Sequence, residues 1–210
     1  MSEPLSLERL RPTIPYQAAA LAVTVMTASL ALSFAEGFTR GPIEHAIAED
    51  TRRSLAEVLP TGSFDNDPGT DRLEARDGDI PVVVHIARQA GVPSAVVLET
   101  STRGYSGEIG LVVGIDREGK VTGVRVTRHS ETPGLGDKIE VAKSDWVHHF
   151  VGRHLADPDP ARWAVRKDGG VFDQFAGATI TPRAVVGAVK RSLELYAREH
   201  ERWFARREAS

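Results

Sequence analysis

The chain begins with a long apolar stretch. No charged residue occurs in positions 12–35, and the residues of 18–34 are apolar or small. A helix of roughly 20 such residues is long enough to cross the hydrocarbon core of a bilayer. The pattern therefore predicts one transmembrane helix over residues 14–35. A cleaved signal peptide ending near residue 35 and a buried core helix are the alternatives.

The charges that flank this stretch predict its orientation. Arg9 and Arg11 precede it and Glu36 follows it. Basic residues stay on the cytoplasmic side, whereas acidic residues contribute little to orientation. We therefore expect residues 1–13 to be cytoplasmic. The chain would be a single-pass protein of a bacterial inner membrane, with its main domain in the periplasm.

Residues 36–80 form a connecting segment in this interpretation. Positions 42–59 show the spacing of apolar residues that is typical of a helix, and residues 60–79 are rich in Gly, Asp and Pro. Asp65, Asp67 and Asp71 in the second stretch suggest calcium, but the glycine and the closing Glu of a calcium loop are missing. A solvated surface loop is the favoured interpretation.

The remaining residues, 81–210, have the pattern of an α+β domain. Runs of β-branched residues separated by turn sequences predict four antiparallel strands, at 82–87, 95–100, 109–116 and 121–128. A helix over 140–154, a short strand over 162–165 and a long helix over 182–207 should follow. The long helix repeats apolar residues every three or four positions, so we expect helices packed on one side of a mainly antiparallel sheet.

The start of the long helix has the features of a phosphate site. Thr181 is predicted to be the N-cap and Pro182 the first helical residue, which places the free N–H groups of the helix beside Thr179. Gly177 and Ala178 leave room for a bulky group to approach the backbone. An ordinary capped helix start has the same features and remains the alternative.

Composition excludes several other functions. The chain has 26 basic and 29 acidic residues, a net charge of -3 and no long run of Lys or Arg, so we expect no nucleic-acid partner. It contains no cysteine, which excludes disulfides, an iron–sulfur cluster bound by this chain and a Cys-x-x-Cys-His haem site. No metal site is expected either, because the adjacent His148 and His149 lack the spacing of a chelating pair on a helix.

One block of residues resembles a known modification signal. The sequence from Asp173 to Thr179, Asp-Gln-Phe-Ala-Gly-Ala-Thr, is similar to the flavinylation signal of proteins that carry FMN on a threonine through a phosphoester bond. The resemblance implies that Thr179 carries covalent FMN and that Asp173 and Ala176 belong to the signal. Ala176 stands where many members have serine or threonine.

A second block extends the resemblance to a family. His129-Ser-Glu-Thr-Pro-Gly-Leu-Gly-Asp-Lys138, followed by Lys143-Ser-Asp-Trp146, resembles the G subunits of the Rnf electron-transport complex and, less closely, the C subunits of the sodium-pumping NADH:quinone reductase. By this resemblance, part of the wall around the flavin ring is formed by Glu131, Thr132, Pro133 and Gly134, with Leu135 and Lys138 next to them. Positive charge from Lys138 or Arg183 would raise the flavin potential. Trp146, Trp163 and Phe175 either stack on the flavin or belong to the core.

The resemblance implies an electron relay that catalyses nothing alone. The chain would be a flavoprotein subunit of a membrane-bound ferredoxin:NAD oxidoreductase that couples electron transfer to ion translocation. Its expected partners are the other membrane subunits and, for maturation, a separate flavin transferase. Two alternatives remain: a flavinylated domain of another extracytoplasmic electron-transfer chain, and a non-redox anchored module that binds a nucleotide or an anion.

Overall fold

The computed structural model describes residues 14–205. The chain divides into two units, Met1–Glu49 and Asp50–Ser210, and each is described here by itself. Arg9 and Arg11, on which the predicted orientation depends, lie outside the described residues.

Helix α2, Ile14–Val58, contains all of the described part of the first unit and extends into the second. Its residues Ile14–Gly37 are long and apolar enough to span a membrane, and almost all of them are exposed to the surroundings. The hydroxyls of Thr24 and Thr27 donate to carbonyl oxygens four residues earlier in the helix. These polar groups are therefore paired within the segment, as a hydrocarbon environment requires.

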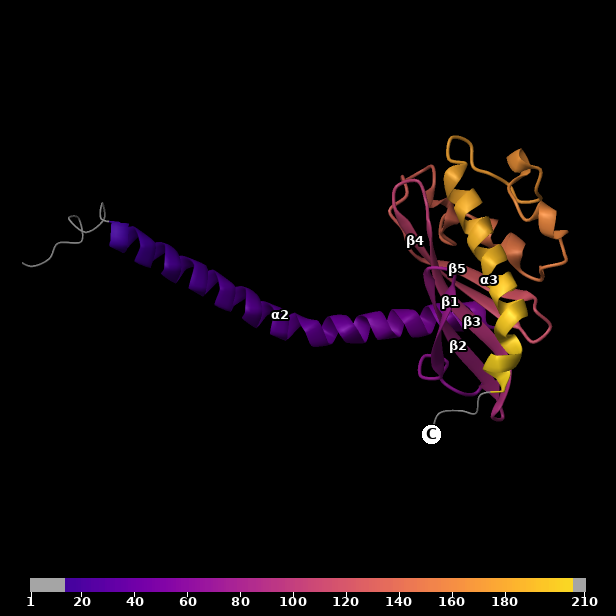
Figure 1. Ribbon diagram of the computed structural model, residues 1–210, viewed down its shortest axis with the longest axis horizontal. Coiled ribbons are helices and arrows are strands. Elements are labelled where there is room, and N and C mark those ends of the chain that lie inside the picture. The colour runs from indigo at the N-terminus through magenta and orange to yellow at the C-terminus, as the bar shows by residue number, and fades with distance from the viewer. Residues whose placement is uncertain (1–13, 206–210) are drawn as a thin grey trace, which may run out of the picture. The chain divides into compact units, whose positions relative to one another are not determined.

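The second unit is built on a five-stranded antiparallel sheet (Figure 1). Its strands are β1 (Arg72–Asp77), β2 (Ile80–Gln89), β3 (Val92–Arg103), β4 (Glu108–Asp116) and β5 (Val121–Arg128), and they lie side by side in chain order. The predicted α+β class and antiparallel sheet are confirmed. Such a meander needs only short hairpin connections.

Side chains alternate between the two faces of the sheet, and both faces are covered. One face packs against helix α3, Ile180–Phe204, through residues such as Val84, Leu98 and Leu193. On the opposite face the last turn of α2, with Leu55 and Val58, packs on a smaller cluster that includes Ala87, Ala95, Val97 and Val112. The prediction of helices on one side only is therefore wrong.

A glycine permits the close contact of α2 with the sheet. A Cβ at Gly123 would lie 2.7 Å from the Cα of Val58. The hydroxyl of Thr122 donates to the Val58 carbonyl over 2.5 Å and satisfies an acceptor at the helix end.

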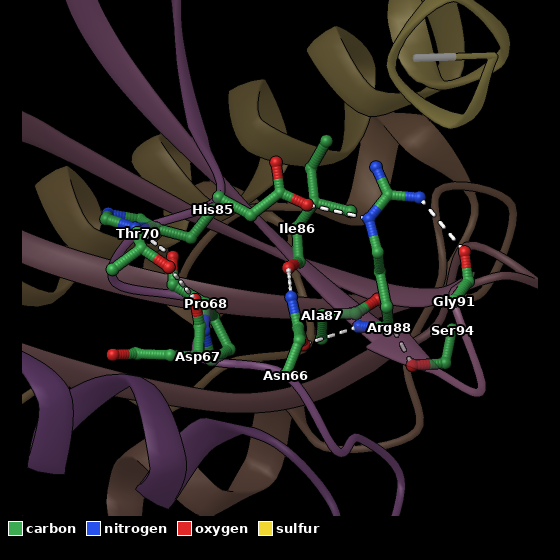
Figure 2. A network of polar contacts seen from close by, with 11 residues as sticks. Asn66, Asp67, Pro68, Thr70, His85, Ile86, Ala87, Arg88, Gly91 and Ser94 are labelled. Carbon is green, nitrogen blue, oxygen red and sulfur yellow. Dashed lines mark hydrogen bonds and ion pairs between the residues drawn. The ribbon is translucent and has the colours of Figure 1, made fainter. Parts of the chain in front are cut away.

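The surface loop predicted over residues 60–79 is confirmed for residues 60–71, which contain no helix or strand, and is wrong for Arg72–Asp77, which form β1. This strand carries alternating charged residues and only Leu73 and Ala75 as apolar ones, as suits a strand at the edge of a sheet. The preceding residues are tied to β2: the Asn66 side chain donates to the Ile86 carbonyl and accepts from the Arg88 amide (Figure 2). Asp71 and Arg88 form a buried ion pair of 2.7 Å.

The predicted helix over 140–154 is also wrong, because only Asp145–Phe150 is helical, as a 3-10 turn capped by Ser144. After this turn the backbone of Gly152 and Arg153 pairs with Val121 at the start of β5, which a continuing helix would prevent. The predicted strand over 162–165 is wrong as well: residues 160–162 form a 3-10 turn, and Val165 makes a single bridge to Phe172.

Candidate functional site

A pocket of about 340 Å³ lies at the start of α3. Three chain segments line it: the tip of the β3–β4 hairpin, the loop that follows residue 130, and the turn that leads into α3. The lining residues are Tyr105, Glu131, Thr132, Leu135, Gly136, Gly177, Ala178, Thr179, Ile180 and Thr181. Its volume is in the range of small-molecule sites.

Thr179 is the N-cap of α3, so the prediction that Thr181 caps this helix is wrong. Thr179 has φ -78° and ψ -28°, and its side chain makes no capping hydrogen bond. The helix begins at Ile180, two residues earlier than predicted. Thr179 therefore lines the pocket beside the N–H groups of Ile180 and Thr181, which have no partner within the helix.

The turn before Thr179 is shaped by Gly177. This residue has φ +79°, a conformation that favours glycine, and the Ala178 amide donates to the Phe175 carbonyl over 3.1 Å. Phe175 is buried edge-on against Trp146 at 5.2 Å between ring centroids. The turn is thereby fixed to the core, and Thr179 with it.

Glu131 places a buried carboxylate at the pocket. Its side chain accepts a hydrogen bond from the Ser106 amide over 2.9 Å and another from the Thr181 hydroxyl. Glu131 as a whole is only 5% exposed. Thr181 is thus used for a contact between distant segments, which explains why it does not cap the helix.

The basic residues considered for the pocket lie elsewhere. Arg183 forms a two-bond ion pair with Asp168, with distances of 2.6 and 2.9 Å. Hydrogen bonding to Arg183 holds the pKa of the Asp168 carboxyl below its usual value, and the same contact raises the pKa of Arg183. Lys138 is exposed and does not line the pocket. The carboxylate among the lining residues is that of Glu131.

The structure brings together most of the residues that the sequence singled out. Seven of them line the pocket: Glu131, Thr132, Leu135, Gly177, Ala178, Thr179 and Thr181. Five others do not, namely Pro133, Gly134, Lys138, Asp173 and Ala176. Asp173 is exposed and lies 3.0 Å from Arg166 in a surface ion pair.

Two lining residues were missed by sequence reasoning, Tyr105 and Ile180, whereas Gly136 belongs to the glycine-rich block 129–138 that the sequence singled out. Tyr105 lies in the turn Tyr-Ser-Gly-Glu between the predicted strands 95–100 and 109–116. Its aromatic side chain in a polar turn was the available signal.

Other candidate groups have structural roles. Trp146, Trp163 and Phe175 are buried in the main core, which agrees with the core interpretation. Asp65, Asp67 and Asp71 are not simply solvated, since Asp65 accepts from the Ala90 amide, Asp67 from the Gly69 amide and Asp71 from Arg88. No group of three or more potential metal ligands occurs among the described residues.

The pocket has the donors that a flavin phosphate ester needs. The small residues Gly177 and Ala178 and the N–H groups at the start of α3 lie next to Thr179 along the chain, and such groups bind phosphate oxygens. The exposed apolar side chains of Tyr105, Leu135 and Ile180 lie around the same space, as suits a planar, largely apolar ring. The residues present therefore fit FMN.

Comparison with known proteins assigns the domain to a class. Residues 104–194 match the family model of the FMN-binding domain, and this range contains all ten residues that line the pocket. The second unit therefore contains an FMN-binding domain.

Relatives over most of the chain define the family. The chain is 50% identical over 174 residues to the G subunit of the ion-translocating oxidoreductase complex of Cereibacter sphaeroides, covering 82% of this chain and 80% of the relative. It is 48% identical over 185 residues to that of Pseudomonas aeruginosa (85% and 86%) and 44% identical over 199 residues to that of Stutzerimonas stutzeri (94% and 87%). The chain belongs to the family of Rnf-complex G subunits, components of a multi-subunit ion-translocating oxidoreductase.

Proposed function

We propose that this chain carries FMN covalently, as a phosphoester of Thr179, and passes electrons between neighbouring subunits of its complex. One observation supports this above the others. Thr179 lines the pocket, its side chain makes no capping hydrogen bond, and Gly177 and Ala178 directly precede it. A threonine that served only as a helix cap would use its hydroxyl on the helix.

The residues around Thr179 have separate tasks in this proposal. The first-turn N–H groups of α3 bind the phosphoryl oxygens, and the positive end of the helix dipole favours their negative charge. Gly177 leaves space beside the ester. FMN supplies reversible one- and two-electron chemistry, while the protein holds and orients it. Covalent attachment prevents its loss from an exposed domain.

Attachment requires a separate flavin transferase with FAD as donor. The Thr179 oxygen forms a new bond to the phosphorus on the FMN side of the FAD diphosphate. The phosphorus–oxygen bond to the adenylate breaks, AMP leaves, and the hydroxyl proton passes to a base of the transferase. No change of oxidation state occurs.

The location of the domain is part of the proposal. We infer that Ile14–Gly37 crosses the inner membrane once, with the residues before it in the cytoplasm and the FMN-binding domain in the periplasm. The length and apolar character of this segment support the span, and Arg9 and Arg11 support the orientation.

The mass of the purified chain tests the attachment. The chain produced together with its transferase should be heavier by one FMN less one water, and peptide mapping should find the increment on Thr179. Thr179→Ala should remove the increment and the flavin fluorescence of the denatured band, with the fold intact. Thr179→Ser is the matched control, because it keeps a hydroxyl and should keep part of the label. Full labelling of Thr179→Ala would exclude this residue as the attachment point.

A further inference from the structure

Exposed apolar side chains gather at the pocket. Among the described residues of the second unit, five large apolar side chains are exposed: Val92, Tyr105, Leu135, Val151 and Ile180. Three of them line the pocket together with Thr179, and Tyr105 is the most exposed at 71%. Leaving an aromatic ring in water at this position costs free energy unless a bound group covers it.

The backbone that carries Tyr105 is nevertheless held in place. The Gly104 amide donates to the Gly107 carbonyl over 2.7 Å and closes the hairpin tip. The Ser106 amide donates to the Glu131 carboxylate over 2.9 Å. The tip is therefore fixed, although the Tyr105 side chain is in solvent.

One carboxylate joins this tip to the attachment turn. Glu131 accepts from Ser106 on one oxygen and from Thr181, in the first turn of α3, on the other. Gly104 and Gly136 leave no room for a side chain next to it: a Cβ at Gly104 would lie 2.6 Å from the Ile109 Cδ1, and one at Gly136 2.9 Å from the Glu131 Cβ. The buried side chain of Glu131 thus ties the hairpin tip that carries Tyr105 to the start of α3, next to Thr179, so that both residues line the same pocket.

We propose that Tyr105 is an aromatic cover for the flavin ring and that Glu131 is the residue that positions it. This inference rests on the proposed ester at Thr179, which brings the ring into the same pocket. A planar ring tethered there meets Tyr105 on the hairpin side and Leu135 and Ile180 at the rim. Stacking with an aromatic side chain stabilises the covered arrangement, because both surfaces leave water.

Flavin fluorescence in the full-length labelled chain tests the cover. Tyrosine quenches flavin fluorescence on contact, so Tyr105→Ala should raise the fluorescence yield and the quenching by added iodide. The equilibrium between covered and open ring should shift by about 2- to 10-fold, the effect of losing one aromatic pair. Tyr105→Phe should keep the low access to iodide, because a flat ring remains.

Val92→Ala is the matched control, since Val92 is an exposed apolar residue at the turn of another hairpin and lies outside the pocket. It should change neither signal. Unchanged iodide access in Tyr105→Ala, or an equal change in Val92→Ala, would overturn the proposed cover while FMN remains on Thr179. Absence of FMN from Thr179 in the parent chain would overturn the function and this inference together.

The positioning role of Glu131 needs a second set of variants. Glu131→Gln and Thr181→Val should both raise iodide access, whereas Thr181→Ser keeps the hydroxyl and should restore the parent value. Thermal unfolding of the same variants in a Thr179→Ala background measures their structural cost without flavin. Low iodide access in both Glu131→Gln and Thr181→Val would show that Tyr105 is positioned without this carboxylate.

Discussion

Thr181 donates its hydroxyl hydrogen bond to the carboxylate of Glu131, a residue 50 positions earlier in the chain. Both side chains are buried. The contact takes Thr181 out of the capping role that its place before Pro182 predicts. It leaves Thr179 as the N-cap, with a hydroxyl that makes no bond to the helix. A tertiary contact thus engages the hydroxyl of Thr181, while that of Thr179 makes no capping hydrogen bond.

The space around this contact leads to a prediction for Gly136. Its backbone, with φ -86° and ψ -19°, suits any residue, but a Cβ would lie 2.9 Å from the Thr181 hydroxyl oxygen and 2.9 Å from the Glu131 Cβ. Gly136→Ala should therefore lower the free energy of unfolding by about 1–3 kcal/mol through overpacking, and it should reduce labelling of Thr179. Chemical denaturation and intact mass measure the two effects.

Gly187→Ala is the matched control for Gly136→Ala. Gly187 lies within α3, and a Cβ there meets only the Arg191 side chain at an ordinary 3.5 Å. Alanine should stabilise the helix by about 0.5–1 kcal/mol relative to glycine. Equal effects of the two substitutions would contradict the packing argument.

The buried ion pair of Asp71 and Arg88 should be critical for the fold. Asp71→Ala removes a carboxylate from a guanidinium that is 2% exposed. Since the positive charge stays buried, we expect a loss of about 3–5 kcal/mol in the free energy of unfolding. Arg52→Ala breaks the exposed pair with Asp67 and should cost about 0–1 kcal/mol. Similar losses in both variants would contradict the distinction.

The sequence predicted four of the five strands because their β-branched residues are frequent enough to stand out from the turns. It missed β1, whose sequence Arg-Leu-Glu-Ala-Arg-Asp is mostly charged. Such an edge strand is stabilised by pairing with β2, which local sequence does not reveal. The prediction of a helix over 140–154 was wrong for a similar reason, since the pairing of Gly152 with Val121 ends the 3-10 turn Asp145–Phe150.

The same difference between local pattern and tertiary contact separates the site residues that the sequence indicated from those that it missed. Thr179, Gly177 and Ala178 were found because they lie together in the chain and form a recognisable block. Tyr105 was missed because it reaches the pocket only through the hairpin and its bond to Glu131. Residues brought together by tertiary contacts leave no local pattern, so a single sequence indicates the turn before α3 and the loop after residue 130 but not the hairpin tip that carries Tyr105.

Tyr196 should make stability depend on alkaline pH. Burial, followed by repulsion from Asp116, raises the pKa of Tyr196 to about 12 from 10.0. A raised pKa means that the folded state favours the neutral phenol, so this contribution is complete below pH 10 and is lost as the pH rises through about 12. Tyr196→Phe should therefore show a smaller fall in unfolding free energy between these pH values. Parallel curves for parent and variant would contradict this assignment.

The proposed orientation predicts the side of the membrane on which the C-terminus lies. A reporter that is active only in the periplasm, fused after Ser210, should be active, and the mature chain should keep its N-terminal residues. Replacing Arg9 and Arg11 with Glu should lower reporter activity, because the positive residues that retain the N-terminus in the cytoplasm are removed. A mature N-terminus at Glu36 would instead indicate a cleaved signal peptide.

Asp173 provides the sharpest test of modification by a separate enzyme. Its side chain is exposed and outside the pocket, and its described ion pair, with Arg166, lies at the surface. Such a pair contributes about 0–1 kcal/mol, so Asp173→Ala should fold normally. If the transferase reads this carboxylate, Asp173→Ala should lose most of its FMN label. Arg166→Ala breaks the same ion pair but keeps the carboxylate, and it should be labelled like the parent chain. Equal loss of label in both variants would assign the effect to the ion pair. Full labelling of the parent chain in a host without a flavin transferase would show that a separate enzyme is not needed.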